Sequence, residues 1–186
     1  MKLSDKWQLL KSKKIFTSDI LTLFRDTLKT PLQAKTNWEY IQRKQSGVVI
    51  IPYFPSTDSF ILVKQYRHPI KKSIWQFPGG GKSKNQTFYQ TAKTELLEET
   101  GYSCKKLISL GKVYPNTGII SNSGYIYIAI NPVFQQKPQK NSIEIIASKK
   151  FTHQQFLSLI KKGYIRDNWS LSAYLLFLLK LNKNKL

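Results

Sequence analysis

The chain has 186 residues, 41% of them hydrophobic and 13% aromatic, which excludes a disordered or collagen-like protein and suits one domain with a sizeable core. Thirty Lys and Arg residues against ten Asp and Glu residues give a net charge of +20, which permits a nucleic acid, an anionic membrane surface or a small phosphorylated substrate as the partner. Only four of the thirty are arginine, the residue that binds phosphates and bases in a bidentate manner, so lysine spread over a solvated surface is favoured over a nucleic-acid face.

Alternating or β-branched stretches predict seven strands, and helical spacing predicts three helices. In chain order they are strands 21–24, 38–41, 48–54 and 60–66, helix 87–100, strands 107–114, 125–130 and 143–146, and helices 152–162 and 168–181. The first helix ends before Gly101, and the second begins at a Thr152 cap. The third is apolar on most sides and is predicted to be buried.

Strands and helices do not alternate regularly along the chain, so an α/β or α+β domain is favoured over a doubly wound parallel sheet. A soft boundary at 45–47 separates an N-terminal β segment, 1–45, from a main domain, 46–186.

Three features predict a cytoplasmic protein without a membrane partner. Cys104 is the only cysteine, so an intramolecular disulfide and a cysteine zinc cluster are both excluded. Residues 1–14 carry charges throughout and contain no apolar signal-peptide core. The longest apolar stretch, 171–181, is too short to span a bilayer.

Glutamate is scarce, and three of the five glutamates fall within five residues of the first predicted helix. Glu95, Glu98 and Glu99 share one helix face, where like charges at this spacing are destabilising unless a cation lies among them. Two interpretations follow from the spacing alone. The face is either a solvated acidic surface neutralised by nearby lysines, or a binding site for a hard divalent cation such as Mg²⁺.

A glycine-rich turn precedes this helix and favours the second interpretation. Residues 75–81 read Trp-Gln-Phe-Pro-Gly-Gly-Gly, and glycines at such a turn let the backbone approach a ligand closely. The residues that follow mimic the end of a P-loop, but Gln76 stands where a P-loop requires its first glycine, so a P-loop is excluded.

Residues 80–102 resemble the Nudix box, G-x5-E-x7-R-E-U-x-E-E-x-G-U with U apolar, and match seven of its nine positions. The nine positions are Gly80, Gln86, Thr94, Glu95, Leu96, Glu98, Glu99, Gly101 and Tyr102. The resemblance implies an α/β/α sandwich around a mixed sheet, preceded here by the N-terminal β segment. Gln86 replaces a glutamate, and Thr94 replaces an arginine that pairs with a metal-binding glutamate in the family. Threonine cannot form that ion pair, which predicts weaker metal affinity or slower turnover.

The flanking sequence resembles the ADP-ribose pyrophosphatase and nucleoside-diphosphate-sugar hydrolase branch of that family. Residues 64–69, Lys-Gln-Tyr-Arg-His-Pro, match a strand motif whose arginine contacts substrate phosphate, which implies that Arg67 binds substrate; a surface arginine is the alternative. Trp38 and Glu39 resemble an adenine-recognition pair, with an ordinary tryptophan of the N-terminal sheet as the alternative. Gly80 is expected to lie where the backbone approaches the substrate.

The same resemblance implies the catalytic set. Glu95, Glu98 and Glu99 would bind Mg²⁺, with Mn²⁺ as a substitute, and Glu99 is also counted as catalytic. Glu144 is assigned as the general base, because it is the only carboxylate between Glu99 and Asp167. Segment 1–45 is implied to cross to a partner subunit in a homodimer.

The expected activity is Mg²⁺-dependent hydrolysis of the pyrophosphate of ADP-ribose or a related nucleoside diphosphate sugar, which releases a nucleoside monophosphate and a sugar phosphate. Two alternatives stay open. Gln86 and Thr94 would suit a catalytically weakened protein that binds nucleotide sugars without turnover. The positive charge would suit a pyrophosphohydrolase of RNA 5′ ends.

Overall fold

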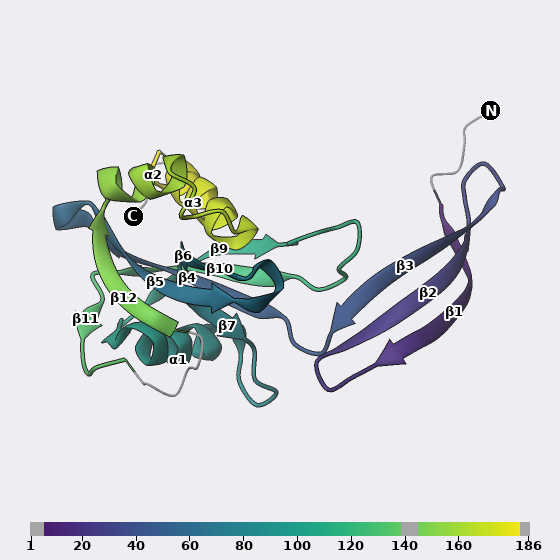
Figure 1. Ribbon diagram of the computed structural model, residues 1–186, viewed down its shortest axis with the longest axis horizontal. Helices are drawn as coiled ribbons and strands as arrows, with labels where there is room; N and C mark the ends of the chain where they lie inside the picture. The colour runs from purple at the N-terminus through teal and green to yellow at the C-terminus, as the bar shows by residue number, and fades with distance from the viewer. Residues whose placement is uncertain (1–5, 139–144, 183–186) are drawn as a thin grey trace. The chain divides into compact units, whose positions relative to one another are not determined.

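The computed structural model describes residues 6–138 and 145–182, which form two compact units (Figure 1). Unit 1 contains the described residues up to 46 together with 114–123, and unit 2 contains 47–113 and the described residues from 124 onward. The strands are β1 (Gln8–Thr17), β2 (Leu21–Lys29), β3 (Lys35–Arg43), β4 (Gly47–Phe54), β5 (Ser59–Arg67), β6 (Lys72–Gln76), β7 (Gly79–Gly81), β8 (Tyr102–Ser103), β9 (Leu107–Val113), β10 (Gly124–Ile130), β11 (Val133–Phe134) and β12 (Ile145–Thr152). The α-helices are α1 (Phe88–Thr100), α2 (His153–Lys161) and α3 (Asn168–Leu181).

Unit 1 is an antiparallel sheet in the order β1-β2-β3, with the 114–123 segment attached to β3. Ile41 donates its backbone N–H to Ile119 at 2.7 Å and accepts one from Ser121 at 3.0 Å. Every residue of β1 is exposed, and Thr22 is the only buried residue among those that the structure describes in this unit. The sheet therefore has almost no hydrophobic core of its own.

Unit 2 is built on a seven-stranded mixed sheet. Its main order is β12-β5-β4-β10-β9, with β6 paired to β5 and β7 paired to β4; β4 and β10 are parallel, and the other pairs are antiparallel. Side chains alternate along β4, so Val48 and Ile50 pack toward α1, whereas Val49 and Ile51 pack toward α2 and α3. The sheet thus lies between helical layers (Figure 1), which confirms the predicted α/β/α sandwich around a mixed sheet.

The three predicted helices are confirmed, and so are the Gly101 end of the first and the Thr152 cap of the second. The Thr87 hydroxyl caps α1 in a capping box with Gln90, and Gly101 ends the helix with φ 78°. Thr152 caps α2 in the same way. The prediction that the third helix is buried is wrong for one face, because Leu175 and Leu179 of α3 are 58% and 51% exposed. Only the opposite side of α3 packs on the sheet.

Strands with few apolar residues were not predicted from the sequence. Strand β1 is interrupted by lysines, and β12 continues through Lys149 and Lys150 to Thr152, well beyond the predicted 143–146. Both lie at sheet edges, where one side of the strand pairs with no neighbour, so charged side chains are tolerated there.

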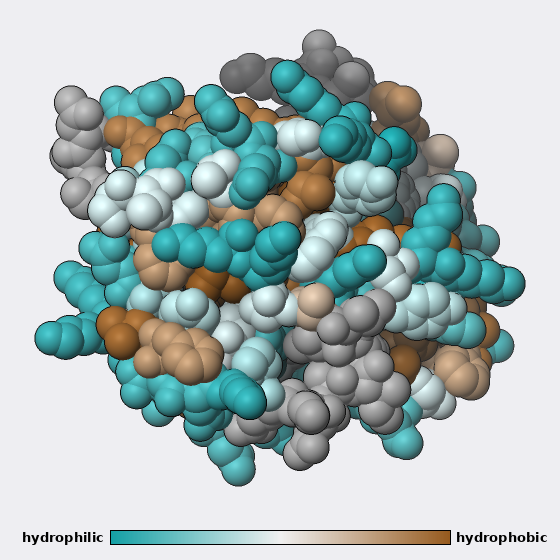
Figure 2. Space-filling model, turned by 60° about the vertical axis from the view of Figure 1, so that its left-hand side comes forward, coloured by the Kyte–Doolittle hydropathy of each residue, from teal (hydrophilic) through white to brown (hydrophobic). Residues whose placement is uncertain are grey.

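Hydrophilic side chains are dispersed on the face shown in Figure 2, with hydrophobic patches between them, as expected for lysine spread over a surface. Among the residues that the structure describes, no helix is both long and apolar enough to cross a membrane.

Candidate active site

Helix α1 carries the three clustered glutamates on the side of the molecule where the glycine strand β7 contacts it. Glu99 is only 7% exposed, and Glu95 and Glu98 are half-buried. A solvated acidic face would leave all three carboxylates in water. The burial of Glu99 therefore argues against that interpretation and favours a functional cluster.

The Glu99 carboxylate accepts two hydrogen bonds from neighbouring strands. The Gly79 backbone N–H donates to Oε2 at 2.8 Å, and the Gln65 side-chain amide donates to Oε1 at 2.9 Å. Burial raises the pKa of Glu99 to about 8, and these two donors and Arg67 only partly oppose the effect. Burial, with the nearby Glu98 charge, raises the pKa of Glu95 to about 7.

The glycines of β7 allow the helix to approach the sheet closely. A Cβ at Gly80 would lie 2.2 Å from Oε1 of Glu95, so the Glu95 carboxylate occupies the space that a side chain would need. A Cβ at Gly79 would lie 2.2 Å from the backbone oxygen of Val48, with which β7 pairs. Glycine at 80 is therefore required by the position of Glu95.

Arg67, at the end of β5, is connected to Glu99 through two glutamines. Its Nε and one terminal nitrogen donate to Oε1 of Gln76 at 3.1 and 3.0 Å. Gln76 in turn donates to Oε1 of Gln65 at 2.6 Å, and Gln65 donates to Glu99. Sequence reasoning had not identified either glutamine as a site residue. The sequence offered little signal for them, because each glutamine stands near the end of a strand that also contains other polar residues, such as Lys64 in β5 and Ser73 in β6.

The two departures from the Nudix box contact each other. The Gln86 amide donates to the Thr94 hydroxyl at 3.2 Å, and the Thr91 hydroxyl donates to the Gln86 carbonyl oxygen at 3.2 Å. Lys82 Nζ donates to the backbone oxygen of Gln86 at 2.8 Å. The neutral Gln86, Thr91 and Thr94 side chains therefore hold the loop against α1 at the place where the resemblance implied an ion pair.

The glutamate carboxylates of this site suit a hard divalent cation whose coordination shell is completed by other ligands. Within residues 6–138 and 145–182, no three His, Cys, Asp or Glu side chains are close enough to form a metal cage by themselves. Mg²⁺ commonly takes one or two carboxylates and fills its remaining positions with water and substrate phosphates. Glu95 and Glu99 offer such carboxylates, and their raised pKa values show that ionisation is costly without a nearby cation.

Three other predicted site residues do not belong to the described part of unit 2. Glu144 falls outside the described residues. Trp38 and Glu39 belong to unit 1, where the Trp38 indole N–H donates to the backbone oxygen of Gly118 at 3.1 Å and Glu39 pairs with Arg25. Glu95, Glu98, Glu99, Gly80 and Arg67 all belong to unit 2.

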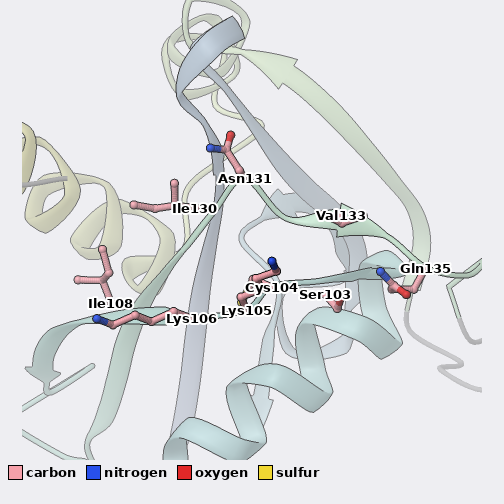
Figure 3. A pocket seen from close by; sticks show the side chains of 9 residues that line it. All are labelled: Ser103, Cys104, Lys105, Lys106, Ile108, Ile130, Asn131, Val133 and Gln135. Carbon is pink, nitrogen blue, oxygen red and sulfur yellow. The ribbon is translucent and has the colours of Figure 1, made fainter.

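A separate cavity of about 600 Å³ lies between the two-stranded β8–β11 sheet and the neighbouring ends of β9 and β10 (Figure 3). Its lining is mainly apolar and includes Ile108, Ile130 and Val133, with Lys105 and Lys106 beside them. No residue that the sequence predicted as functional lines this cavity.

The raised pKa values of Glu95 and Glu99 predict an unusual pH dependence of stability. Both folded-state values, about 7 and about 8, exceed the ordinary 4.5, so the metal-free folded chain holds more protons than the unfolded chain between about pH 4.5 and 8. Its free energy of unfolding therefore falls as pH rises through that window. We expect the metal-free protein to unfold at a temperature several degrees lower at about pH 8.5 than at about pH 5.5.

Calorimetric scans with EDTA, and with excess Mg²⁺, measure this effect. Mg²⁺ is expected to remove most of the loss at high pH, because a bound cation favours the ionised carboxylates. The double variant Glu95→Gln/Glu99→Gln is the control and should show a flatter profile. A metal-free unfolding temperature that rises across the window would contradict the assignment.

Comparisons with known proteins agree with this architecture. The NUDIX domain family matches residues 43–170. The chain is 26% identical over 171 residues to "ADP-ribose pyrophosphatase" of Bacillus subtilis (strain 168), which covers 91% of this chain and 90% of that protein. It is 30% identical over 120 residues to "Methanol dehydrogenase activator" of Bacillus methanolicus, 64% of each chain. A solved structure described as "ADP compounds hydrolase" has a TM-score of 0.84 at 18% identity and covers 96% of both chains, so it shares the fold.

Proposed function

This chain belongs to the NUDIX domain family, and on that premise we propose that it hydrolyses the pyrophosphate of ADP-ribose or a related nucleoside diphosphate sugar in a Mg²⁺-dependent reaction. The resemblance seen in residues 80–102 is thereby confirmed at the level of the family, and the chain is a Nudix hydrolase acting on pyrophosphate bonds. One observation supports the specific proposal most strongly. The buried Glu99 carboxylate, held by Gly79 and Gln65, lies in one hydrogen-bonded cluster with Arg67.

In the proposed reaction, water attacks one phosphorus of the pyrophosphate and the bond from that phosphorus to the bridging oxygen breaks. Arg67 binds and orients the phosphates. Glu95, Glu98 and Glu99 would hold Mg²⁺, which when bound neutralises the phosphate oxygens and lowers the pKa of the attacking water. Glu144, outside the described residues, is proposed to accept the proton from that water. The products are a nucleoside monophosphate and a sugar phosphate.

A substrate panel tests the proposal. The metal-free protein is incubated with ADP-ribose, other nucleotide sugars and RNA bearing a 5′-triphosphate, each with Mg²⁺, with Mn²⁺ and with EDTA. We expect nucleoside monophosphate from ADP-ribose or another nucleotide sugar, Mn²⁺ as a substitute, and none with EDTA. Release of pyrophosphate from RNA alone would instead favour the RNA-end reaction.

Nucleotide-sugar binding without turnover is a second candidate function, favoured by the neutral Gln86–Thr94 contact. Calorimetry that detects binding in samples without any product would support it and would exclude the hydrolase proposal for those substrates.

For unit 1 we propose a role in homodimer formation, with Trp38 and Glu39 available for recognition of the base. A three-stranded sheet without a core is not stable alone, and β1 exposes apolar side chains such as Leu9 and Phe16 along its length. A second copy of the chain would cover them. The domain assignment of 1–45 and 46–186 rests on the same proposal.

Phe16→Glu is expected to convert the dimer to a monomer, because a buried carboxylate in the proposed interface would be unpaired. Light scattering coupled to size-exclusion chromatography measures the mass. Leu175→Glu on α3 is the matched control, since Leu175 has the same 58% exposure in unit 2, and it should stay dimeric. A wild-type chain that is monomeric at micromolar concentration would contradict the dimer.

A further inference from the structure

An oriented chain of hydrogen bonds links Arg67 to Glu99. It runs from the Arg67 guanidinium to the Gln76 carbonyl oxygen, from the Gln76 amide to the Gln65 carbonyl oxygen, and from the Gln65 amide to Glu99. Gln65 and Gln76 are 4% and 6% exposed, so neither amide can exchange its partners readily for water. Both are long, neutral and able to donate and accept, which is what an internal link of such a chain requires.

The groups at the two ends fix the direction of this hydrogen-bond network. Guanidinium groups only donate, so Gln76 must present its carbonyl oxygen to Arg67 and its amide nitrogen to Gln65. Gln65 must then accept from Gln76 and donate to Glu99. If Gln65 were reversed, its carbonyl oxygen would face the Glu99 carboxylate and its amide would face the Gln76 amide. Both ends of the network therefore require the same direction: Arg67 can only donate, and the ionised Glu99 carboxylate, three hydrogen bonds away, can only accept.

Two hydrogen bonds hold the backbone next to this hydrogen-bond network in place. The Ser170 hydroxyl, in the first turn of α3, accepts the Phe77 backbone N–H at 3.0 Å. The Pro78 backbone oxygen accepts the Ile50 N–H at 2.9 Å. These two contacts fix the segment between Gln76 and Gly79, and Gly79 supplies the second donor to Glu99. Each carboxylate oxygen of Glu99 thus accepts a hydrogen bond from a donor that is itself held in place, Gln65 at Oε1 and Gly79 at Oε2.

We propose that Gln65 and Gln76 are positioning residues that couple the phosphate-binding Arg67 to the cation-binding Glu99. They act as one unit, because loss of either glutamine breaks the same hydrogen-bonded connection between Arg67 and Glu99. This inference rests on the proposed roles of Arg67 and Glu99. Its consequence is that loss of either glutamine weakens cation binding, although neither side chain contacts the cation.

Mn²⁺ titration calorimetry on the metal-free full chain tests the coupling without relying on turnover. The samples are the wild type, Gln65→Met, Gln76→Met and the double variant. Each single variant is expected to bind Mn²⁺ about ten-fold more weakly, as is usual when an outer-shell partner of a ligand is removed. The double variant is expected to lose about the same ten-fold, whereas independent residues would lose about a hundred-fold. Ser59→Ala, a buried polar residue on the same strand β5, is the control and should keep wild-type affinity.

A second measurement needs no substitution of either glutamine. In an NMR spectrum of the diamagnetic, metal-free protein, Arg67→Met is expected to shift the side-chain amide signals of both Gln76 and Gln65. Arg67 donates to Gln76, and Gln76 donates to Gln65, so a role for Gln65 that is independent of this network would leave its signal unchanged.

The inference is overturned if the single variants bind Mn²⁺ as tightly as the wild type does, or if the double variant binds it about a hundred-fold more weakly. It is also overturned if Arg67→Met leaves the Gln65 amide signal unchanged. Hydrolysis assays then separate this outcome from a failure of the proposed function. If no nucleotide sugar is cleaved but the Mn²⁺ cycle is non-additive, the coupling holds and only the proposed substrate is wrong.

Discussion

Glu99→Gln is expected to lower kcat for the cleaved nucleotide sugar about a thousand-fold, equivalent to about 4 kcal/mol of transition-state stabilisation. The substitution removes a negative charge that would bind the cation. It also places an amide NH₂ group where two donors, Gly79 N–H and the Gln65 amide, now point at carboxylate oxygens. Steady-state rates under saturating Mg²⁺ measure the loss.

The fold should survive this substitution. Burial of the ionised Glu99 is costly, as its raised pKa shows, so a neutral side chain of the same size relieves that cost while it loses one hydrogen bond. We expect the free energy of unfolding to stay within about 1 kcal/mol of the wild type. Asp19→Asn, an exposed change of the same kind in unit 1, is the control for both assays. Turnover within ten-fold of the wild type would show that Glu99 does not bind the catalytic cation.

Gly80→Ala is expected to lower kcat about a hundred-fold while the protein remains folded. The new methyl group would meet the Glu95 carboxylate, whose Oε1 and Cδ atoms lie 2.2 and 2.4 Å from the ideal Cβ position. These atoms form the end of a flexible side chain, so Glu95 can rotate away at little cost to stability but no longer holds its place beside Glu99. Loss of one positioned ligand is worth about 3 kcal/mol of barrier.

A double-mutant cycle makes this prediction specific. In a Glu95→Ala background, Gly80→Ala should cost almost nothing further, because the side chain that it displaces is already absent. Rates for the four proteins, with urea unfolding of each, complete the measurement. Independent, multiplicative losses would mean that Gly80 acts on something other than Glu95.

The parts of the site that are local in sequence could be predicted from it. The helix and its Gly101 end follow from short-range rules, and the spacing of Glu95, Glu98 and Glu99 places them on one face. The burial of Glu99 could not be predicted in this way, because it depends on β7 and β5 covering one turn of α1. Periodicity describes a face of a helix but does not say what packs against it.

The parts that depend on pairing between distant strands could not be predicted. Gln65 and Gln76 face each other only because β5 pairs with β6 in one register, Gln65 opposite Ile74 and Val63 opposite Gln76. Strand β1 pairs with β2 although its lysines hide the alternation. The wrong prediction for α3 has a related cause. A helix that is apolar on most sides can still cover only one sheet, so Leu175 and Leu179 face outward.

Unit 1 is formed by two separate stretches of the chain, and this affects the order in which the protein folds. Ser121 donates its backbone N–H and its hydroxyl to the backbone oxygen of Ile41, although the two residues are 80 apart in sequence. The segment 114–123 is also the connection of the β9–β10 hairpin, so formation of that hairpin brings the ends of the segment together and reduces the entropy that must be lost when it docks on β3. The β1–β2–β3 meander precedes this segment in the chain. Unit 1 is therefore expected to complete its folding after the β9–β10 hairpin of unit 2 has formed.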